Sequence, residues 1–185
     1  MTSLAEKNGL RFKPEGHFRN LCNDLNLMQG RKVKRSVKNN YLYGRYQGHD
    51  IMVFDYYYLS HLFYIVRFSF FVLTLPVSLP ELLISKEKLL LKMGQSLGYD
   101  DIDFESREFS DKFCVRSKNK KFAYDFCNAK MIEYLLKNDD SNIEVENNVL
   151  SIFFDHRLEP KNIETNMNRL ITIRSLMPEY LFSGR

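Results

Sequence analysis

Four carboxylates in one short segment are the first residues of this 185-residue chain that could do chemistry. Carboxylate oxygens at alternate positions are hard ligands of the kind that Ca²⁺ and Mg²⁺ take. The segment lacks the central glycine and the bidentate acid of a calcium loop, and in a strand its alternate residues would form a row open to solvent. We therefore predict a solvated connection and no metal site here. The four residues are Asp100, Asp101, Asp103 and Glu105.

Cations and tyrosines are interleaved between residues 31 and 46, a mixture that platforms for single-stranded nucleic acid use. In a strand they divide between two faces, so only a few cations share one surface. Lysines also protect the edge strand of a sheet from aggregation, and this structural interpretation is favoured over polyanion binding, to nucleic acid or anionic lipid. With two tyrosines further along, the candidate binding residues are Arg31, Lys32, Lys34, Arg35, Tyr41, Tyr43, Arg45, Tyr46, Tyr56 and Tyr58.

Acid–base groups are present, but they form no recognisable catalytic motif. His49 and His61 flank expected turns, and His156 follows an expected strand with no nucleophile motif beside it. The chain has no Walker loop, GxGxxG, GxSxG or HExxH pattern. We predict no cofactor, and an enzyme is the less favoured hypothesis. Its site would lie near Asp55, Arg67 and His156.

The cysteines and the first residues bear on the cellular compartment. Cys22, Cys114 and Cys127 are an odd number at spacings that match neither a disulfide framework nor a metal knuckle. They are typical of buried thiols in a reducing compartment. Residues 1–8 are polar and lack the apolar core of a signal peptide, so we predict a cytoplasmic location.

Hydrophobic spacing predicts the strands that position these groups. From residue 31 the apolar period approaches two, and a Gln-Gly pair at 47–48 suits the turn of a hairpin. Residues 62–79 are mostly apolar, but Arg67 near their middle favours a long third strand over a membrane helix. We expect the hairpin and this strand to form a meander, with Asp55 opposite Ile65 and ion-paired to Arg67. The third strand's row Val66, Phe68, Phe70 and Val72 should face the core.

The rest of the chain contains helical and strand patterns, segregated rather than strictly alternating, without a linker between them. The expected helices cover 14–28, 86–97, 119–137 and a segment from Pro160 that Pro178 ends; strands are expected at 82–84 and 112–117, and a hairpin over 143–154 turns at Asn147-Asn148. The predicted fold is therefore α+β: an antiparallel β-meander and a second β-hairpin packed with about three to four amphipathic helices. We expect residues 1–185 to form a single domain, with a weak subdivision near 76–80.

Several stretches, in order along most of the chain, resemble a large uncharacterised family of bacterial proteins. Residues 43–56 (YGRYQGHDIMVFDY) match its G-x-x-x-G-x-x-v-x-v-f-D-Y segment. Residues 97–104 and 108–115 are similar to its D-I-D-F and e-F-s blocks, and residues 8–12 (NGLRF) are similar as well. The resemblance implies a bacterial protein of this fold, and it brings no activity, ligand or site residue.

The surplus of aromatic residues and the uneven distribution of charge bear on whether the chain binds a protein, a nucleic acid or a membrane. The chain has 15 Phe, 11 Tyr and no Trp, and Tyr56, Tyr57 and Tyr58 cannot all face inward in one strand. Exposed aromatic surface often marks an interface. The net charge is only +4, with a basic first quarter. We predict a non-catalytic interaction module, with a protein partner or self-association favoured over nucleic acid or a membrane surface.

Overall fold

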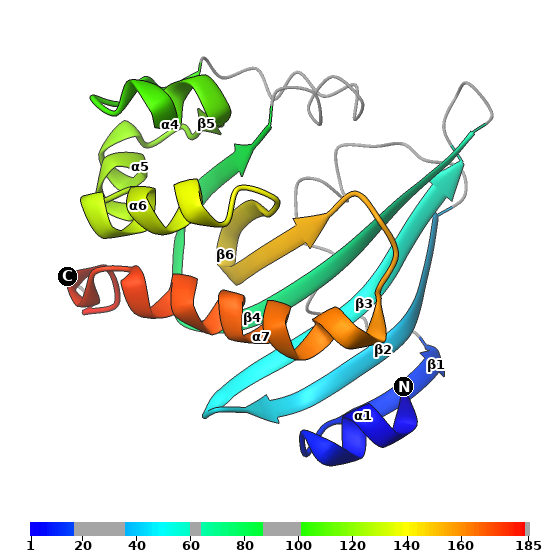
Figure 1. The fold of residues 1–185 in the computed structure, drawn as a ribbon. Coiled ribbons are helices and arrows are strands. Elements are labelled where there is room, and N and C mark those ends of the chain that lie inside the picture. The colour runs from blue at the N-terminus through cyan, green and yellow to red at the C-terminus, as the bar shows by residue number, and fades with distance from the viewer. Residues whose placement is uncertain (17–35, 60–63, 87–100, 184–185) are drawn as a thin grey trace.

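One antiparallel sheet of six strands, with helices packed on one face, makes up the fold (Figure 1). The computed structural model describes residues 1–16, 36–59, 64–86 and 101–183. The α+β class predicted from the sequence is confirmed. In chain order the elements are α1 (Thr2–Lys7), β1 (Arg11–Glu15), β2 (Ser36–Tyr46), β3 (His49–Leu59), β4 (Ile65–Ser85), α4 (Arg107–Lys112), β5 (Cys114–Arg116), α5 (Lys120–Phe126), α6 (Ala129–Lys137), β6 (Asn142–Phe154), α7 (Pro160–Leu176) and the 3₁₀ turn η1 (Glu179–Leu181).

Strand β4 is the centre of the sheet. Its 21 residues pair with β3 at the beginning and with β5 at the end, while β6 runs along its other side. The strand order is β1-β2-β3-β4-β5, with β6 attached to β4. The predicted meander β2-β3-β4 is confirmed. Its first turn has positive φ at both central residues, 47° at Gln47 and 84° at Gly48, as a tight two-residue hairpin turn requires.

The predicted second hairpin is wrong. Residues 142–154 form the single strand β6, and Asn147 has a φ of 52° within it. The β4–β6 register shifts opposite this point, between Thr74 and Leu82, where Pro76 and Pro80 interrupt β4. Prolines cannot donate to a ladder and are tolerated at such irregularities. Pairing with the long β4 on both sides of the irregularity keeps β6 extended, and the predicted short strand 82–84 is simply the end of β4.

The helices follow the sequence pattern less evenly than the strands. Helix α7 begins at Pro160 and ends before Pro178 as predicted. The expected helix 119–137 is two helices, α5 and α6. Of the expected helix 14–28, residues 14 and 15 belong to β1, and 17–28 lie outside the described residues. The expected helix 86–97 also falls almost entirely outside them. No helix in the described ranges is long and apolar enough to cross a membrane.

Asn128 causes the break between α5 and α6. Its side-chain oxygen accepts the N–H groups of Lys130 and Met131 at the start of α6. Its amide nitrogen donates to the carbonyl of Leu176 at the end of α7, 3.0 Å away. An N-cap residue takes a non-helical conformation, so the chain cannot continue as one helix through it.

We expect Asn128→Ala to lower the free energy of unfolding by about 2 kcal/mol, because it removes a cap and the link to α7. The matched control is Asn119→Ala, which removes only the bond from Phe122 N–H at the start of α5 and should cost about 1 kcal/mol. Urea unfolding followed by far-ultraviolet circular dichroism measures both. Equal losses would show that the bond to Leu176 contributes nothing.

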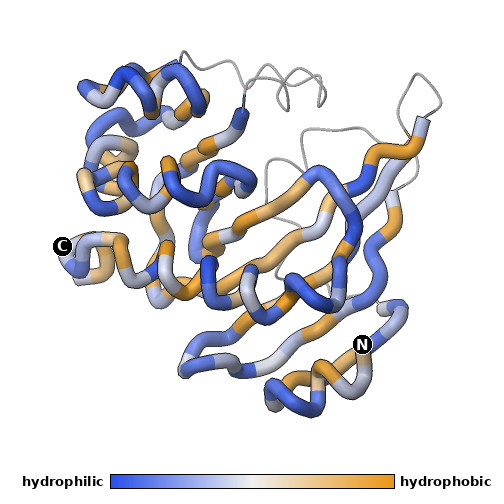
Figure 2. The backbone as a smooth tube through the Cα atoms, viewed as in Figure 1, coloured by the Kyte–Doolittle hydropathy of each residue, from blue (hydrophilic) through white to orange (hydrophobic). Residues whose placement is uncertain are grey.

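Buried side chains line both faces of the sheet. The predicted row Val66, Phe68, Phe70 and Val72 is buried, but it lies in an aromatic cluster on the face opposite α7. The helix-side core uses the other parity of β4, including Phe71 and Leu73. Hydrophobic stretches accordingly run along the central strands, whereas hydrophobic and hydrophilic residues alternate along α7 (Figure 2). The long apolar third strand is therefore explained by burial on two sides.

Candidate functional site

A row of polar side chains marks the place where the helix layer ends. Asn39, Asp55 and Ser69 are direct partners across β2, β3 and β4, on the face that α7 covers further along. Asp55 is 8% exposed and Ser69 1%. Buried polar groups need partners, so such a row has a structural or functional reason. On one side of the row lies the helix-side core, and on the other no described helix covers the sheet face.

Asp55 ties the loop between β6 and α7 to the sheet. One carboxylate oxygen accepts the backbone N–H of Leu158 at 2.7 Å, and the other accepts the side-chain amide of Asn40 at 2.8 Å. Asn40 has a φ of 55° and sits in a bulge, where two residues of β2 oppose one of β3. A bulge re-aims a side chain, and Asn tolerates this backbone conformation better than most residues.

The predicted ion pair between Asp55 and Arg67 is wrong. The predicted register placed Asp55 opposite Ile65, whereas the structure pairs Asp55 with Ser69 and Tyr57 with Arg67. Arg67 is still on the same face, but both carboxylate oxygens of Asp55 bind other donors. The guanidinium group of Arg67 is thereby left exposed at the open end of the sheet.

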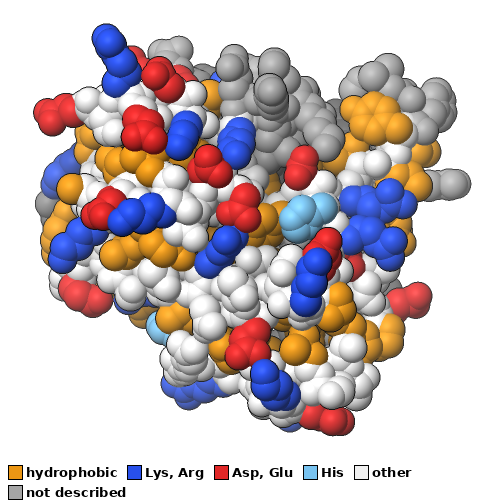
Figure 3. Space-filling model, viewed as in Figure 1, with side chains coloured by type: hydrophobic (Ala, Val, Ile, Leu, Met, Phe, Trp, Pro, Cys, Tyr) orange, Lys and Arg blue, Asp and Glu red, His pale blue; other side chains and the backbone are white. Residues whose placement is uncertain are grey.

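Two adjoining hollows lie at this end. The smaller has a volume of about 260 Å³ and the larger about 570 Å³, and both are lined by Ile65, Arg67 and Arg157. We refer to the pair as the sheet-end groove. Figure 3 shows hydrophobic, basic and histidine side chains close together in this part of the molecule. The residues used to define the groove are Asp55, Tyr64, Ile65, Arg67, His156 and Arg157.

Exposed apolar side chains surround the groove. Six large hydrophobic residues of the described ranges are strongly exposed. Two of them, Tyr64 and Ile65, line the hollows, and two more, Val37 and Leu59, lie on the adjoining strands; all four are 44–49% exposed. Val37 opposes Tyr57, and Leu59 opposes Ile65, so these side chains share the face of Arg67. Clustered exposed apolar surface beside charged groups indicates an interaction site.

The groove lacks the contacts that an acid–base site would need. Within the described residues, no hydrogen bond or ion pair joins Asp55, Arg67 and His156 to one another. The His156 ring stacks on Phe154 with centroids 5.4 Å apart, and its Nδ1 is 3.1 Å from the carbonyl of Arg157. The described ranges also contain no group of three metal-ligating side chains.

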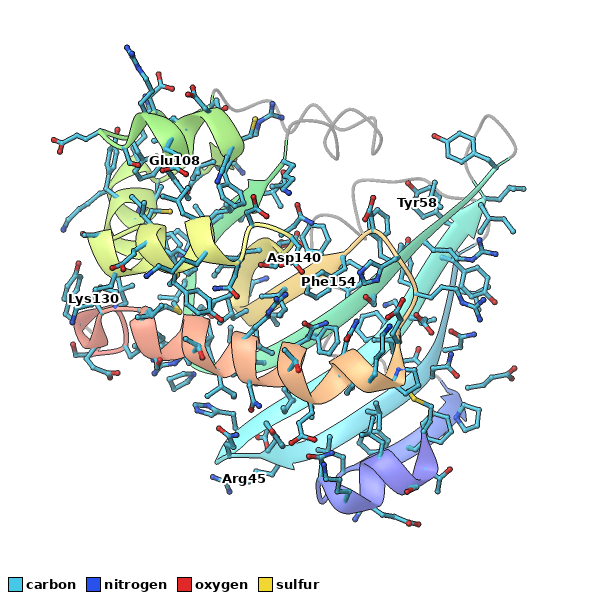
Figure 4. The ribbon with its side chains drawn as sticks, viewed as in Figure 1. Arg45, Tyr58, Glu108, Lys130, Asp140 and Phe154 are labelled. Atoms are coloured by element: carbon cyan, nitrogen blue, oxygen red, sulfur yellow. The ribbon has the colours of Figure 1, made fainter. Side chains whose placement is uncertain are left out.

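The residues predicted to bind do not gather in one place. Tyr41, Tyr56 and Tyr58 are at most 3% exposed and pack in the aromatic cluster behind the sheet. Tyr43 is partly buried beside them, and the hydroxyl of Tyr46 donates to Asn168 of α7. Figure 4 places Arg45 and Tyr58 at opposite ends of the hairpin. The other four predicted residues, Arg31, Lys32, Lys34 and Arg35, lie outside the described residues.

The described cations of the basic segment are also far apart. Arg45 is exposed at the hairpin end, and its Nε donates to the carbonyl of Gly48. Lys38 lies seven residues earlier on β2, about 23 Å away along the strand, and its ammonium group is 5.8 Å from the Phe54 ring. The described part of this segment therefore offers no compact cationic surface.

The acidic segment and the cysteines, the other residues considered for chemistry, have structural roles where the structure describes them. One oxygen of Asp101 accepts the N–H of Val115 at 2.6 Å, which ties the acidic segment to β5. Cys127 is 3% exposed, and burial raises the pKa of its thiol far above the ordinary value, so this cysteine is not a nucleophile. Cys114 is partly buried, and Cys22 and Asp100 lie outside the described residues.

Sequence reasoning missed Arg157 and the apolar residues around the groove. Arg157 is 90 residues from Arg67 in the chain, and only the antiparallel pairing of β4 with β6 brings their elements together. One signal was present: residues 155–157 (DHR) follow a strand and precede a helix, a position where sites occur.

The fold defines the class of this protein: an α+β protein with one antiparallel sheet, on one face of which the described helices pack. No family model matches the chain, and no curated protein matches it. A solved structure that resembles it is that of the mycobacterial trehalose monomycolate transport factor A, TtfA, with a TM-score of 0.65. The match covers 96% of this chain and 93% of that one. At 13% identity it shows the fold alone.

Proposed function

We propose that this protein is a non-catalytic binding module that takes an amphiphilic, lipid-like ligand at the sheet-end groove. The observation that carries the proposal is that two exposed apolar side chains line the hollows together with two exposed arginines, and that two more, Val37 and Leu59, lie on the adjoining strands. An amphiphile presents an apolar chain next to a polar head, which is the combination that this surface complements. The absence of a linked acid–base group in the described part of the groove agrees with binding rather than catalysis.

The comparison with TtfA also supports the proposal of a lipid-like ligand. That protein is named as a transport factor for trehalose monomycolate, and the two chains share one fold over nearly their whole lengths. A fold hosts many functions, so the support for this chain comes from its own surface. The likeness adds that this architecture is found in a protein named for lipid transport.

The test is binding of the full chain to vesicles of zwitterionic phosphatidylcholine, measured by flotation. We expect Leu59→Ser with Ile65→Ser to weaken this binding about thirtyfold, because each side chain loses about 1 kcal/mol of apolar burial. The matched control, Tyr180→Ser, removes an apolar side chain that is 58% exposed elsewhere and should leave binding unchanged. No vesicle binding by the native chain, or equal loss in the control, would refute the proposal.

A protein partner at the same groove is the second candidate function. Tyr64 and Arg67 belong to the residue types enriched at the centres of protein interfaces, and Tyr57 lies beside Arg67 on the same face. The simplest such partner is a second copy of the chain. Sedimentation velocity over a range of concentrations would then detect a dimer that Leu59→Ser with Ile65→Ser dissociates, and a monomer at every concentration would exclude self-association.

A further inference from the structure

We propose that Arg67 and Arg157 form an anion subsite that holds the phosphate of an anionic phospholipid headgroup at a membrane surface. The inference rests on the proposed function and adds the chemistry of the ligand's head. Arg67 comes from the beginning of β4, and Arg157 from the loop between β6 and α7. Both side chains are exposed, and both line the two hollows of the sheet-end groove.

The charges of the two arginines are not neutralised by the described residues around them. None of the ion pairs in the described ranges includes either residue. The oxygens of Asp55 bind Asn40 and Leu158, and Glu159 lies 3.3 Å from the ammonium group of Lys161. Asp155 also lines the larger hollow, and none of the ion pairs among the described residues joins its carboxylate to Arg67 or Arg157.

The fork of a guanidinium group matches phosphate oxygens bidentately, and two such groups on one cavity can surround a single phosphate. The hydrogen bond from Leu158 N–H to Asp55 fixes the loop that carries Arg157 against the strand that precedes Arg67. The two arginines are therefore presented from a connected framework rather than from independent chain ends. This is the arrangement expected of a subsite for one anionic group.

The apolar neighbours favour a lipid headgroup over a free phosphate ion. Leu59 and Ile65, 44% and 49% exposed, lie next to Arg67 on the same sheet face. A soluble phosphate would gain nothing from them. A phospholipid in a bilayer offers its phosphate to the arginines and its interfacial region to the apolar side chains, so both parts of the surface are used.

The experiment compares the full chain on phosphatidylcholine vesicles with and without phosphatidylglycerol. We expect tighter binding when phosphatidylglycerol is present, and Arg67→Gln with Arg157→Gln should weaken that binding about thirtyfold, since each cation near an anionic membrane contributes about a factor of five. Binding to phosphatidylcholine alone should change much less, because the choline ammonium group of that headgroup neutralises its phosphate and leaves the membrane without net charge. The matched control is Arg45→Gln, which removes an exposed cation at the opposite end of the hairpin and should have little effect.

The two vesicle types distinguish failure of the anion subsite from failure of the proposed lipid binding. If the native chain binds both vesicle types equally and the arginine variants change nothing, the anion subsite is wrong while the proposed lipid binding stands. If neither vesicle binds, both fail. Titration of inorganic phosphate, followed by calorimetry, distinguishes the sources: phosphate binding as tight as vesicle binding would identify a soluble phosphate ligand and overturn the membrane proposal. If Arg45→Gln alone weakened binding about fivefold, as expected for each groove arginine, the attraction would be nonspecific, and the membrane proposal would be overturned as well.

Discussion

Phe70→Ala will lower the free energy of unfolding by about 3–5 kcal/mol, because it removes a ring from a closely packed aromatic cluster. Phe70 is 1% exposed on β4 and packs against four aromatic rings. Its ring is stacked on Phe54 and Phe153 at centroid distances of 5.4 and 5.3 Å, and Tyr56 and Phe68 are each 6.1 Å away. Removing the ring leaves a cavity between three strands that cannot collapse without breaking sheet pairing.

A domain of ordinary stability has only about 5–15 kcal/mol in total, so this variant will be close to unfolded. Because the chain has no tryptophan, urea unfolding is best followed by far-ultraviolet circular dichroism. Phe70→Leu keeps most of the volume and should cost clearly less. The control on the same strand is Ile65→Ala, 49% exposed, which should stay within about 0.5 kcal/mol of the native chain. A loss below about 1 kcal/mol for Phe70→Ala would mean that the cluster is loosely packed.

Local signals in the sequence predicted the local parts of this fold. The Gln47-Gly48 turn needs positive φ at both positions, which that residue pair supports, and the hairpin formed where expected. Pro160 at the first turn of α7 likewise defined a helix boundary. These features depend on a few neighbouring residues, so no tertiary information was required.

Features that depend on long-range pairing were not predictable in the same way. Asn147-Asn148 resembles a turn, but ten residues of β4 pair along β6 on both sides of it and keep the strand extended. The register between β3 and β4 was also displaced, which removed the expected pairing of Asp55 with Arg67. The sequence correctly placed these two residues on one face, because strand alternation is unchanged by an even shift. Arg157 joins them only through the connection between β6 and α7.

Asp55→Ala should lower the free energy of unfolding by about 2–4 kcal/mol and also release the loop that carries Arg157. The carboxylate is 8% exposed and accepts two hydrogen bonds, from Leu158 N–H and from the amide of Asn40. Alanine leaves both donors without their acceptor in a partly buried place, and each unsatisfied donor costs about 1–3 kcal/mol. The bulge at Asn40 loses the contact that orients its side chain.

Two substitutions and a local measurement separate this anchoring role from a general effect of charge. Asp55→Asn keeps the shape and one acceptor oxygen, so it should lose about half as much stability as alanine. Asp50→Ala removes an exposed carboxylate at the other end of β3 and should change stability by less than about 0.5 kcal/mol. Hydrogen exchange at the Leu158 amide gives the local readout, because its bond to Asp55 is the protection that alanine removes. Unchanged exchange at Leu158 in Asp55→Ala would show that the loop is held by packing alone, and the arginines of the groove would then keep their positions without the carboxylate.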